Sequence, residues 1–562
     1  MLHPNHPLAG QVVRVVRQTG HSAYAERRWV IELDDGIRLS IPGINTRAPW
    51  GILYPKYLTT GGTLVSTQSI NPEERLRHLE GHYADRVTAF RQRLARVGFD
   101  RVLIVLLDIG KNVHWTTASL ASGLELVRPH RLPSTHTGLT QFIQMTDSLV
   151  AKHNPSLLLL GHEPTGVYHE PWARDLMDRY APHLHGKAQP DFEYRFFNPY
   201  QVKLARLQTH LRHRKTDPRD LAAMLDLMQR GLGQPAFLPT GAELLIRQEV
   251  GFIRAQSRLL GHLERQLRQQ LDRLWPGAIV NVGQFAKAHP DLPKPTPIIQ
   301  TRPLQRDRLR VLLQYCPNPH DLIAMSDQQI LNLYRQHVGR AGPALLNTLR
   351  TWAENAVLLP AQISAPLSKQ VQRLFRQYTA AETLVEEGRG RLVPLLPSTP
   401  ARHLLAIPGL GDMDAAAYLA GLGSHTRFHR AAEVWAFFGF DPIADGSGDK
   451  PERVGHLSKH GDPAARDALY QMGYRVAQNY APVSITFLDA FDRGKSEVEA
   501  TIHAAHRVNR ICFHLMQHDE PFENQSTPTL EGEKARRWRE FKAEKRRRGS
   551  RRKRGKRRSR RR

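Results

Sequence analysis

Four acidic side chains occur at positions that suit the binding of metal ions. Asp108 ends the apolar run VLIVLLDIGK, Glu163 ends LLLLGHEPTGVY, and Asp217 and Asp220 lie in RKTDPRDLAAML. Short apolar runs bounded by polar residues and glycine predict buried strands. The carboxyl ends of neighbouring parallel strands meet at one crevice, and acids three apart at a helix start share one face. We therefore expect the four carboxylates to hold hard divalent cations such as Mg²⁺.

The same residues also have an ordinary structural interpretation. Asp217 followed by Pro218 fits a helix N-terminus, with Asp217 as the N-cap and Asp220 as a capping acid. A single Asp after a strand is most often a turn residue. The residues alone leave both interpretations open, and the combination of two strand-end acids with a D-x-x-D helix start favours a site.

A second candidate centre lies far downstream, at Ser447. This serine stands between two glycines, which leave a hydroxyl accessible as a nucleophile. Cations nearby favour an oxyanion or bind phosphate. They are Arg453, Lys459 and Arg466, with His460 among them. Gly-Ser-Gly by itself is typical of a flexible loop, and Ser458 in LSKHG is the competing nucleophile, although it lacks the paired glycines.

A glycine-containing turn precedes this centre. I-P-G-L-G at residues 407–411, before an alanine-rich stretch, resembles a helix-hairpin-helix turn. In such turns the backbone N–H groups of glycines, here Gly409 and Gly411, approach a phosphate. Similar turns also join helices that bind no ligand.

The order of these motifs resembles one transposase family. The motifs are E-P-T-G-x-Y at 163–168, N-P at 198–199, K-T-D-x-x-D at 215–220, I-P-G-L-G at 407–411, G-F-D-P at 439–442, S-G at 447–448 and L-S-K-H-G at 457–461. They resemble the DEDD transposases of the insertion-sequence one-ten/eleven-eleven family, to which the Piv-type DNA invertases are related. The resemblance covers about residues 100–240 and 395–520.

This resemblance implies specific roles. The acids Asp108, Glu163, Asp217 and Asp220 would be the catalytic, Mg²⁺-binding DEDD set of a RuvC-like, RNase-H-fold domain, and Ser447 would be the nucleophile that forms a covalent phosphoserine with DNA. Members of the family build the site from two subunits and are guided by a bridge RNA. The residues expected to contact nucleic acid are Lys215, Gly409, Gly411, Arg453, Lys459 and Arg466.

The predicted fold class is α/β plus all-α, in five parts. We expect a β-rich extension with a basic helix over 1–98, where Asp35-Gly36 predicts a hairpin, a RuvC-like domain over 99–240, and a helical, coiled-coil region over 241–394. A mainly helical transposase domain over 395–520 and a disordered polybasic tail over 521–562 complete the chain.

The coiled-coil prediction rests on two apolar stripes. Apolar residues recur at spacings of three and four from Ile246 to Leu274 and again from Leu367 to Val385. The two stripes fit a dimeric coiled coil and an intramolecular antiparallel hairpin equally well.

Composition narrows the class of protein. Residues 545–562 hold fourteen Lys or Arg and no acid, about half of the net charge of +27, which predicts a polybasic arm for nucleic acid. The two cysteines exclude a disulfide framework. The chain lacks a signal peptide and a long apolar run, so we expect a soluble, cytoplasmic, nucleoid-associated protein that does not contact the membrane.

The sequence therefore predicts a DNA transposase that acts by metal-assisted serine phosphoryl transfer, as a homo-oligomer (dimer or tetramer) with DNA and a guide RNA as partners. Three alternatives remain: a Piv-like site-specific invertase, a RuvC-like junction nuclease that does not use Ser447, and a non-catalytic RNA-binding scaffold.

Overall fold

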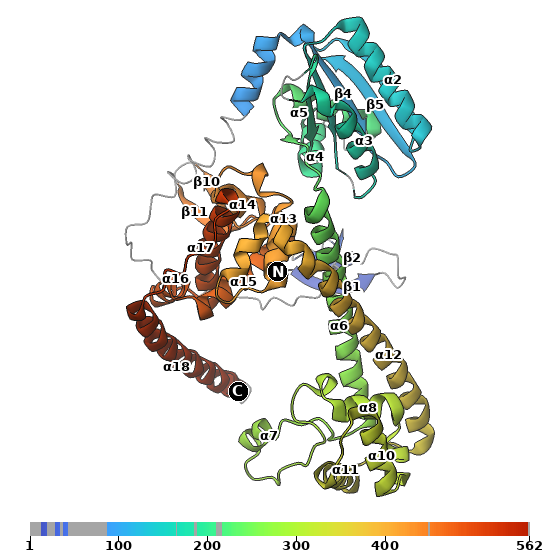
Figure 1. Ribbon diagram of the computed structural model, residues 1–562, viewed down its shortest axis with the longest axis vertical. Helices are drawn as coiled ribbons and strands as arrows, with labels where there is room; N and C mark the ends of the chain where they lie inside the picture. The colour runs from blue at the N-terminus through green and yellow to red at the C-terminus, as the bar shows by residue number, and fades with distance from the viewer. Residues whose placement is uncertain are drawn as a thin grey trace. The chain divides into compact units, whose positions relative to one another are not determined.

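A computed structural model gives the fold of most of the chain (Figure 1). It describes residues 87–164, 166–184, 188–209, 216–447 and 450–559, together with the backbone of three N-terminal strands; the side chains at 209, 444–455, 546 and 548–559 are outside this description. The chain divides into two compact units, Met1–Arg75 and Leu76–Arg562.

The first unit contains a small antiparallel sheet. Its strands are β1 (Val13–Thr19), β2 (Arg28–Leu33) and β3 (Arg38–Pro42), in the order β1-β2-β3. The antiparallel pairing of β2 with β3 confirms the hairpin predicted around Asp35-Gly36. The second unit begins with residues outside the description, and its first described element is helical over residues 87–97, the end of the predicted basic helix.

A six-stranded mixed sheet follows in the second unit. Its strands are β4 (Val102–Asp108), β5 (Val113–Leu120), β6 (Glu125–Pro133), β7 (Leu157–His162), β8 (Asp191–Phe196) and β9 (Gln234–Pro235), in the order β6-β5-β4-β7-β8-β9. The central strands β4, β7 and β8 are parallel, and the other three pair antiparallel. This arrangement is compatible with the predicted RNase-H-like domain.

The sheet is buried on both faces, which explains the uninterrupted apolar runs of β4 and β7. One face packs under α2 (His136–His153) and α3 (Glu170–Tyr180). The opposite face packs against the helix over 87–97, α4 (Pro199–Thr209) and α5 (Asp217–Gln229). Side chains alternate between the two faces, so Leu103 and Val105 belong to the first core and Ile104 to the second.

Two long helices form the middle of the unit. α6 (Gly241–Leu274) and α12 (Ala361–Leu392) pack along each other (Figure 1). They run antiparallel, because Glu249 near the start of α6 pairs with Arg391 near the end of α12, at 2.9 Å. The intramolecular hairpin is thus confirmed, and a coiled-coil dimer stays a prediction. Five short helices connect the pair: α7 (Val282–Ala288), α8 (Asp307–Tyr315), α9 (Pro319–Ala324), α10 (Asp327–Val338) and α11 (Pro343–Asn355).

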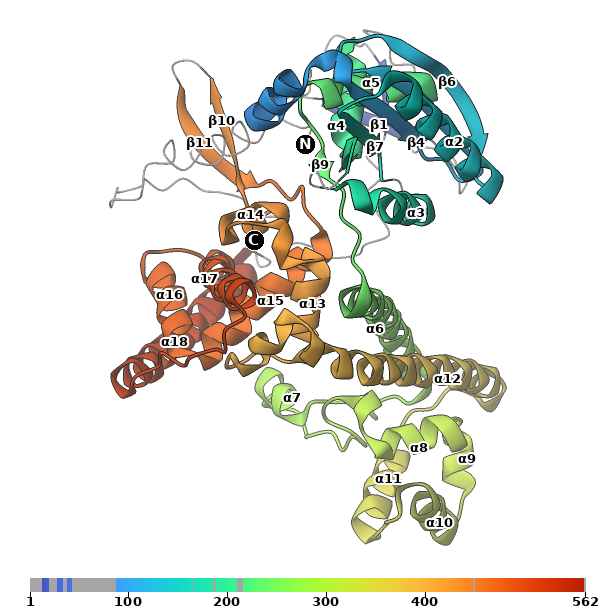
Figure 2. The same cartoon turned by 45° about the horizontal axis from the view of Figure 1, so that its top comes forward.

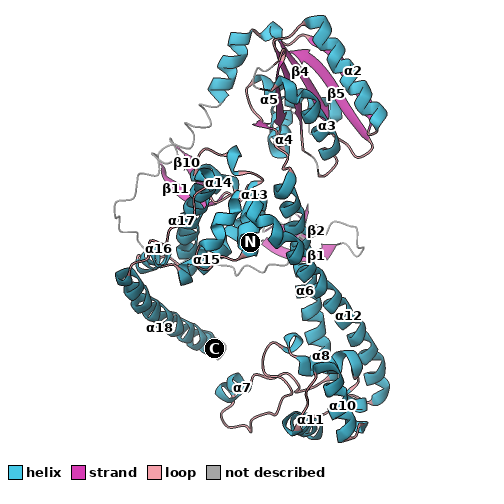
Figure 3. Ribbon diagram, viewed as in Figure 1, coloured by secondary structure: helices cyan, strands magenta, loops and turns pink. Residues whose placement is uncertain are grey.

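The C-terminal part is mainly helical, as predicted (Figure 3). It contains α13 (Asp412–Leu422), α14 (Ala431–Phe437), the antiparallel strands β10 (Pro442–Ser447) and β11 (Lys450–Leu457), α15 (Pro463–Asn479), α16 (Ala481–Asp492) and α17 (Glu497–His518). Among the described helices of the chain, none has the length and apolar character needed to cross a bilayer.

The prediction of a disordered tail from residue 521 is wrong for most of that segment. Helix α18 covers Pro528–Ser559. Its Trp538 and Phe541 are buried against Phe487 of α16, with Trp538 stacked on Phe487 at 5.3 Å. Arg537 adds ion pairs to Asp489 and Asp492. The prediction relied on the basic composition of residues 545–562 and overlooked Trp538 and Phe541, which lie just before them and dock the helix.

A pair of helical glycines tests the packing of the C-terminal part. A Cβ on Gly473 of α15 would lie 2.7 Å from the backbone of Ala505 in α17, whereas one on Gly251 of α6 would meet nothing within 4 Å. Gly473→Ala should lower stability by about 1–3 kcal/mol through overpacking. Gly251→Ala should raise it by roughly 0.5–1 kcal/mol through helix propensity. Equal effects of the two changes in denaturant-unfolding curves would contradict the close contact.

Candidate functional site: a carboxylate cluster and a serine hairpin

The register of β4 and β7 places two predicted acids side by side. Asp108 is the last residue of β4, and Glu163 directly follows β7. The two strands are parallel, and Leu107 pairs with His162. The next positions along the strands are Asp108 and Glu163, separated by about the 4.8 Å spacing of adjacent strands.

The alternation of side chains sets the face on which these acids lie. Asp108 has the parity of Ile104 and Leu106, and Glu163 that of Leu157 and Leu159; these four neighbours all belong to the core under α4 and α5. Helix α5 begins with Asp217 and also carries Asp220. Strand alternation and the start of α5 thus bring all four predicted acids to one side of the sheet.

A glycine allows α5 to lie directly on the sheet. A Cβ on Gly161 of β7 would come within 2.7 Å of Phe197 and 2.8 Å of Met228 in α5. A larger residue would force the side chains of Phe197 and Met228 to move, and with them the packing of the C-terminal end of α5 on the sheet. The signal in the sequence is a single glycine inside an otherwise leucine-rich strand.

Asp220 is buried in an ion pair. Its side chain is 4% exposed and that of Arg206 in α4 is 14% exposed, and the guanidinium donates to the carboxylate. The N-cap of α5 is Thr216, which makes no side-chain cap hydrogen bond, and Asp217 is the first residue inside the helix. The alternative in which Asp217 is the N-cap is therefore wrong.

The four acids do not form a closed ligand cage. Among the described residues, no group of three or more His, Cys, Asp or Glu side chains is gathered closely enough to hold a metal ion. The positive charge that balances Asp220 in this structure is the guanidinium of Arg206. The donor set nevertheless suits a hard cation, because it offers only carboxylate oxygens on one face of the sheet.

The opposite face of the sheet behind Glu163 is aromatic. His162 is fully buried, with ring centroids 5.3 Å from His169 and Tyr194 and 4.6 Å from Phe196. Neither of its ring nitrogens has a hydrogen-bond partner among the described residues. Burial lowers the pKa of His162 well below its usual value. The ring is therefore neutral and packs as an aromatic group beneath the strand end.

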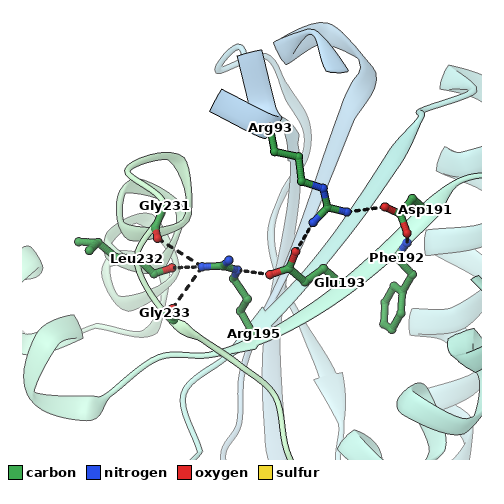
Figure 4. A network of polar contacts seen from close by, with 8 residues as sticks. All are labelled: Arg93, Asp191, Phe192, Glu193, Arg195, Gly231, Leu232 and Gly233. Atoms are coloured by element: carbon green, nitrogen blue, oxygen red, sulfur yellow. Dashed lines mark hydrogen bonds and ion pairs between the residues drawn. The ribbon is translucent and has the colours of Figure 1, made fainter. Parts of the chain in front are cut away.

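A buried arginine network fastens the far end of α5 (Figure 4). Nη1 of Arg195 in β8 donates to the carbonyl oxygens of residues 231, 232 and 233, at 3.2–3.3 Å, and Nε donates to Glu193 at 2.6 Å. Glu193 and Asp191 accept from Arg93 in the helix over 87–97. Sequence reasoning missed both this network and the strand that carries Glu193 and Arg195.

The backbone places Ser447 at the tip of a β-hairpin. It is the last residue of β10 and pairs with Lys450, the first residue of β11 (Figure 2). Arg453 lies opposite Asp445 in the same ladder. The side chains of Ser447 and Arg453 fall outside the described residues, as does Lys215 altogether.

Two of the motifs meet at the base of this hairpin. The hydroxyl of Ser458 donates to the carboxylate of Asp441, and the Ser458 N–H donates to the Asp441 carbonyl at 2.8 Å. The Lys459 N–H donates to the Gly439 carbonyl at 3.1 Å, with Lys459 in the left-handed region at φ 56°. The segments G-F-D-P and L-S-K-H-G are therefore the two sides of one clasp.

Arg466 belongs to the same clasp. Its Nη1 donates to the carbonyl oxygens of Phe438 at 3.0 Å and Gly461 at 3.5 Å. A Cβ on Gly461 would lie 2.0 Å from the Phe437 carbonyl oxygen, so glycine is required there. In this structure Arg466 braces the hairpin base, and its predicted contact with nucleic acid stays a prediction.

The glycine turn at 407–411 packs against α15. A Cβ on Gly409, at φ 94°, would lie 2.8 Å from the Arg475 carbonyl oxygen and 2.8 Å from Asn479. The Gly411 N–H donates to Asp414 at 3.2 Å, and Asp414 also pairs with Arg475. Internal partners thus account for both glycines, and phosphate binding at this turn stays a prediction.

Comparison with known proteins finds transposase families that match two parts of the chain. Residues 401–488 match the model described as "Transposase IS116/IS110/IS902 family", and residues 105–276 match the "Transposase" model of the IS110 DEDD domain. Over these two ranges the chain is similar to the IS110-family DEDD transposases. The DEDD match covers Asp108, Glu163, Asp217 and Asp220, and the other match covers Ser447.

A curated relative also matches part of the chain. The "Insertion element IS110 uncharacterized 43.6 kDa protein" of Streptomyces coelicolor (strain ATCC BAA-471 / A3(2) / M145) is 23% identical over 238 residues, which cover 42% of this chain. The match spans little more than half of that relative, 57% of its length.

The ion pair between Arg206 and Asp220 yields a stability prediction. Arg206→Gln leaves a buried carboxylate without a counter-charge and should cost about 3–5 kcal/mol in EDTA. Added Mg²⁺ should restore much of the loss, because the cation replaces the guanidinium.

The matched control is Arg230→Gln. Arg230 pairs with the half-buried Asp226 on the same helix, and its own side chain is largely exposed, so its removal should cost no more than about 0.5 kcal/mol. Unfolding curves with and without Mg²⁺ measure both variants. A loss in Arg206→Gln that Mg²⁺ leaves unchanged would contradict a cation site at Asp220.

Proposed function

We propose that this protein is a DNA transposase of a mobile insertion element, with a RuvC-like catalytic domain formed by the six-stranded sheet. The observation that carries the proposal is the placement of Asp108 and Glu163 on adjacent parallel strands, on the face where α5 presents Asp217 and Asp220. The family match supports the same activity.

The four acids would hold divalent metal, with Mg²⁺ as the expected ion. When bound, such ions neutralise the charge that develops on the oxygens of a transferring phosphoryl group. The protein contributes the position of the carboxylates: two are fixed by strand register and two by the start of α5. Arg206 must leave Asp220 for that carboxylate to bind an ion, because the guanidinium already neutralises it in a close ion pair.

Ser447 is the proposed nucleophile. Its hydroxyl oxygen attacks a DNA phosphorus, a bond between phosphorus and a deoxyribose oxygen breaks, and the hydroxyl proton leaves to solvent or a base. The phosphoserine ester keeps the energy of the broken phosphodiester, so a second strand end can attack it and restore the serine. No ATP is needed for this exchange, and the chain contains no GxxxxGK[ST] motif.

The position of Ser447 at a hairpin tip supports this role. A residue at the end of a two-stranded ribbon is reached by a large substrate from several sides, and the clasp of Asp441 with Ser458 holds the base of the ribbon. We further propose, from the family resemblance, that acids and serine from different subunits form the active site, and that a bridge RNA directs the reaction.

A RuvC-like nuclease is the second candidate, because the four acids all lie within one domain. Such an enzyme would hydrolyse DNA with water as the nucleophile and would have no covalent intermediate. The two functions therefore differ in whether Ser447 becomes attached to DNA.

The acids give the first functional prediction. Asp108→Asn should reduce recombination by more than roughly 100-fold, because even outer-shell partners of metal ligands are commonly worth 10- to 100-fold. The control is Asp175→Asn in α3, an exposed acid on the helix that covers the opposite face of the sheet, and it should retain activity. Recombination assays in which both variants behave alike would contradict the proposed metal site.

Ser447 gives the second functional prediction. After incubation with DNA, guide RNA and Mg²⁺ followed by denaturation, DNA should remain attached to the wild-type chain, and peptide mapping should place it at Ser447. Ser447→Ala should abolish the adduct. Ser458→Ala should lower its yield, because the clasp to Asp441 is lost, but leave its position unchanged. Cleavage without any adduct would favour the nuclease, and an adduct in Ser447→Ala would contradict the assignment.

A further inference from the structure

The helices between α6 and α12 lie outside both family matches, which end at residue 276 and resume at 401. Helices α8 to α11 are held on the hairpin of α6 and α12 by a shared core, which includes Trp275 stacked on Trp352 at 5.0 Å. Neither the carboxylate cluster nor the serine hairpin gives this module a function.

The module contains an open cavity of about 920 Å³. Its walls come from residues 297–301, the start of α8, the end of α10 and the start of α11. The charged residues among those that line it are three arginines, Arg306, Arg308 and Arg340, and one acid, Asp307. The cavity therefore carries a net positive charge.

The three arginines that line the cavity lack an acidic partner among the described residues, unlike two other arginines of the module. Arg310 pairs with Glu382 at 2.9 Å and Arg350 with Asp327 at 2.8 Å. Arg306, Arg308 and Arg340 are exposed and form no ion pair with any described residue. Three like charges around one cavity repel one another, and an anion in the cavity would relieve that repulsion.

The backbone around the cavity adds to the positive potential. Helices α8 and α11 both begin at its wall, with Arg306 and Gly342 as N-caps, and neither N-cap side chain accepts a hydrogen bond. The N–H groups of their first turns, except at Pro343, which has none, and the positive ends of their dipoles favour a negative group nearby. The wall is already ordered, because the hydroxyl of the buried Tyr334 donates to the Arg308 carbonyl at 2.5 Å.

We infer that this cavity binds backbone phosphates of DNA, as a contact separate from the catalytic domain and the serine hairpin. Arginine presents paired N–H donors that match phosphate oxygens, and such bonds are charge-assisted. The choice of DNA rests on the proposed transposase function; the phosphate chemistry rests on the cavity alone. The contact would position the duplex without reading its sequence.

The test measures binding of the full chain to duplex DNA in EDTA, so that catalysis plays no part. The variant combines Arg306→Ala, Arg308→Ala and Arg340→Ala. The matched control combines Arg335→Ala, Arg373→Ala and Arg376→Ala, three exposed arginines of the same module and of α12 that do not line the cavity. Both proteins lose three charges, so a difference between them reports the cavity.

We expect the cavity variant to bind duplex DNA about tenfold more weakly than the control and to show a salt slope lower by about 1–2, since each neutralised phosphate contributes roughly 0.9. Asp307→Asn should bind more tightly than wild type, because it removes the one acid of the cavity. Equal affinities of the two triple variants would overturn the inference. A loss confined to RNA of the same length would overturn the assignment to DNA.

A second measurement guards against misfolding of the variant. Wild-type protein is treated with an arginine-specific dicarbonyl reagent, with and without DNA, and the modified residues are mapped. DNA should protect Arg306, Arg308 and Arg340 and leave Arg373 and Arg376 reactive. Uniform protection or none would overturn the inference, whereas a failed recombination assay with normal protection would count only against the proposed transposase activity.

Discussion

The parallel pairing of β4 with β7 is the constraint on which the proposed catalytic site depends. The register that pairs Leu107 with His162 also aligns Asp108 with Glu163. A slip of one residue in either strand would turn one of the two acids toward α2 and α3, into an apolar core. A slip of β7 would also bring Leu160 or His162 to the place of Gly161, where even a Cβ would come within 2.7 Å of Phe197. The packing of the sheet thus fixes the geometry of two carboxylates.

The domain also buries the charged side chains of Arg195 and Asp220, and each is paired with a group of opposite charge or with hydrogen-bond acceptors. Arg195 is buried, which lowers the pKa of its guanidinium, yet Glu193 and three carbonyl oxygens compensate it. Arg206 compensates Asp220 in the same way. The first network holds the segment that follows α5 to β8. The pair of Arg206 with Asp220 lies where a metal ion is proposed to bind. We therefore interpret the Arg195 network as a structural support and Arg206 as a counter-charge that a metal ion can replace.

Local patterns predicted much of the fold and of the candidate site. The strand ends at Asp108 and Glu163, the helix start at Asp217 and the β2–β3 hairpin follow from periodicity and turn residues within short windows. The apolar stripes of α6 and α12 were visible in the same way, but the sequence left open whether they pair within one chain or between two. The features that escaped prediction join distant segments. Arg206 meets Asp220 only because α4 packs on α5, and Asp441 meets Ser458 across a hairpin. The basic composition of the tail predicts disorder, although two aromatic residues dock α18 on α16. In the cavity, Arg340 joins Arg306 and Arg308 from a segment more than thirty residues away, so no short window of sequence contains all three.

The central claim is that the sheet and α5 together form a divalent-metal site, and a crystal structure of the protein soaked in Mn²⁺ tests it most directly. Anomalous scattering locates Mn²⁺ without reference to the chemistry it supports. The account predicts anomalous peaks within coordination distance of Asp108, Glu163 and at least one of Asp217 and Asp220, with Arg206 displaced from Asp220. Intact pairing of Arg206 with Asp220 and no peak at these acids, in crystals where Mn²⁺ is bound elsewhere, would contradict it.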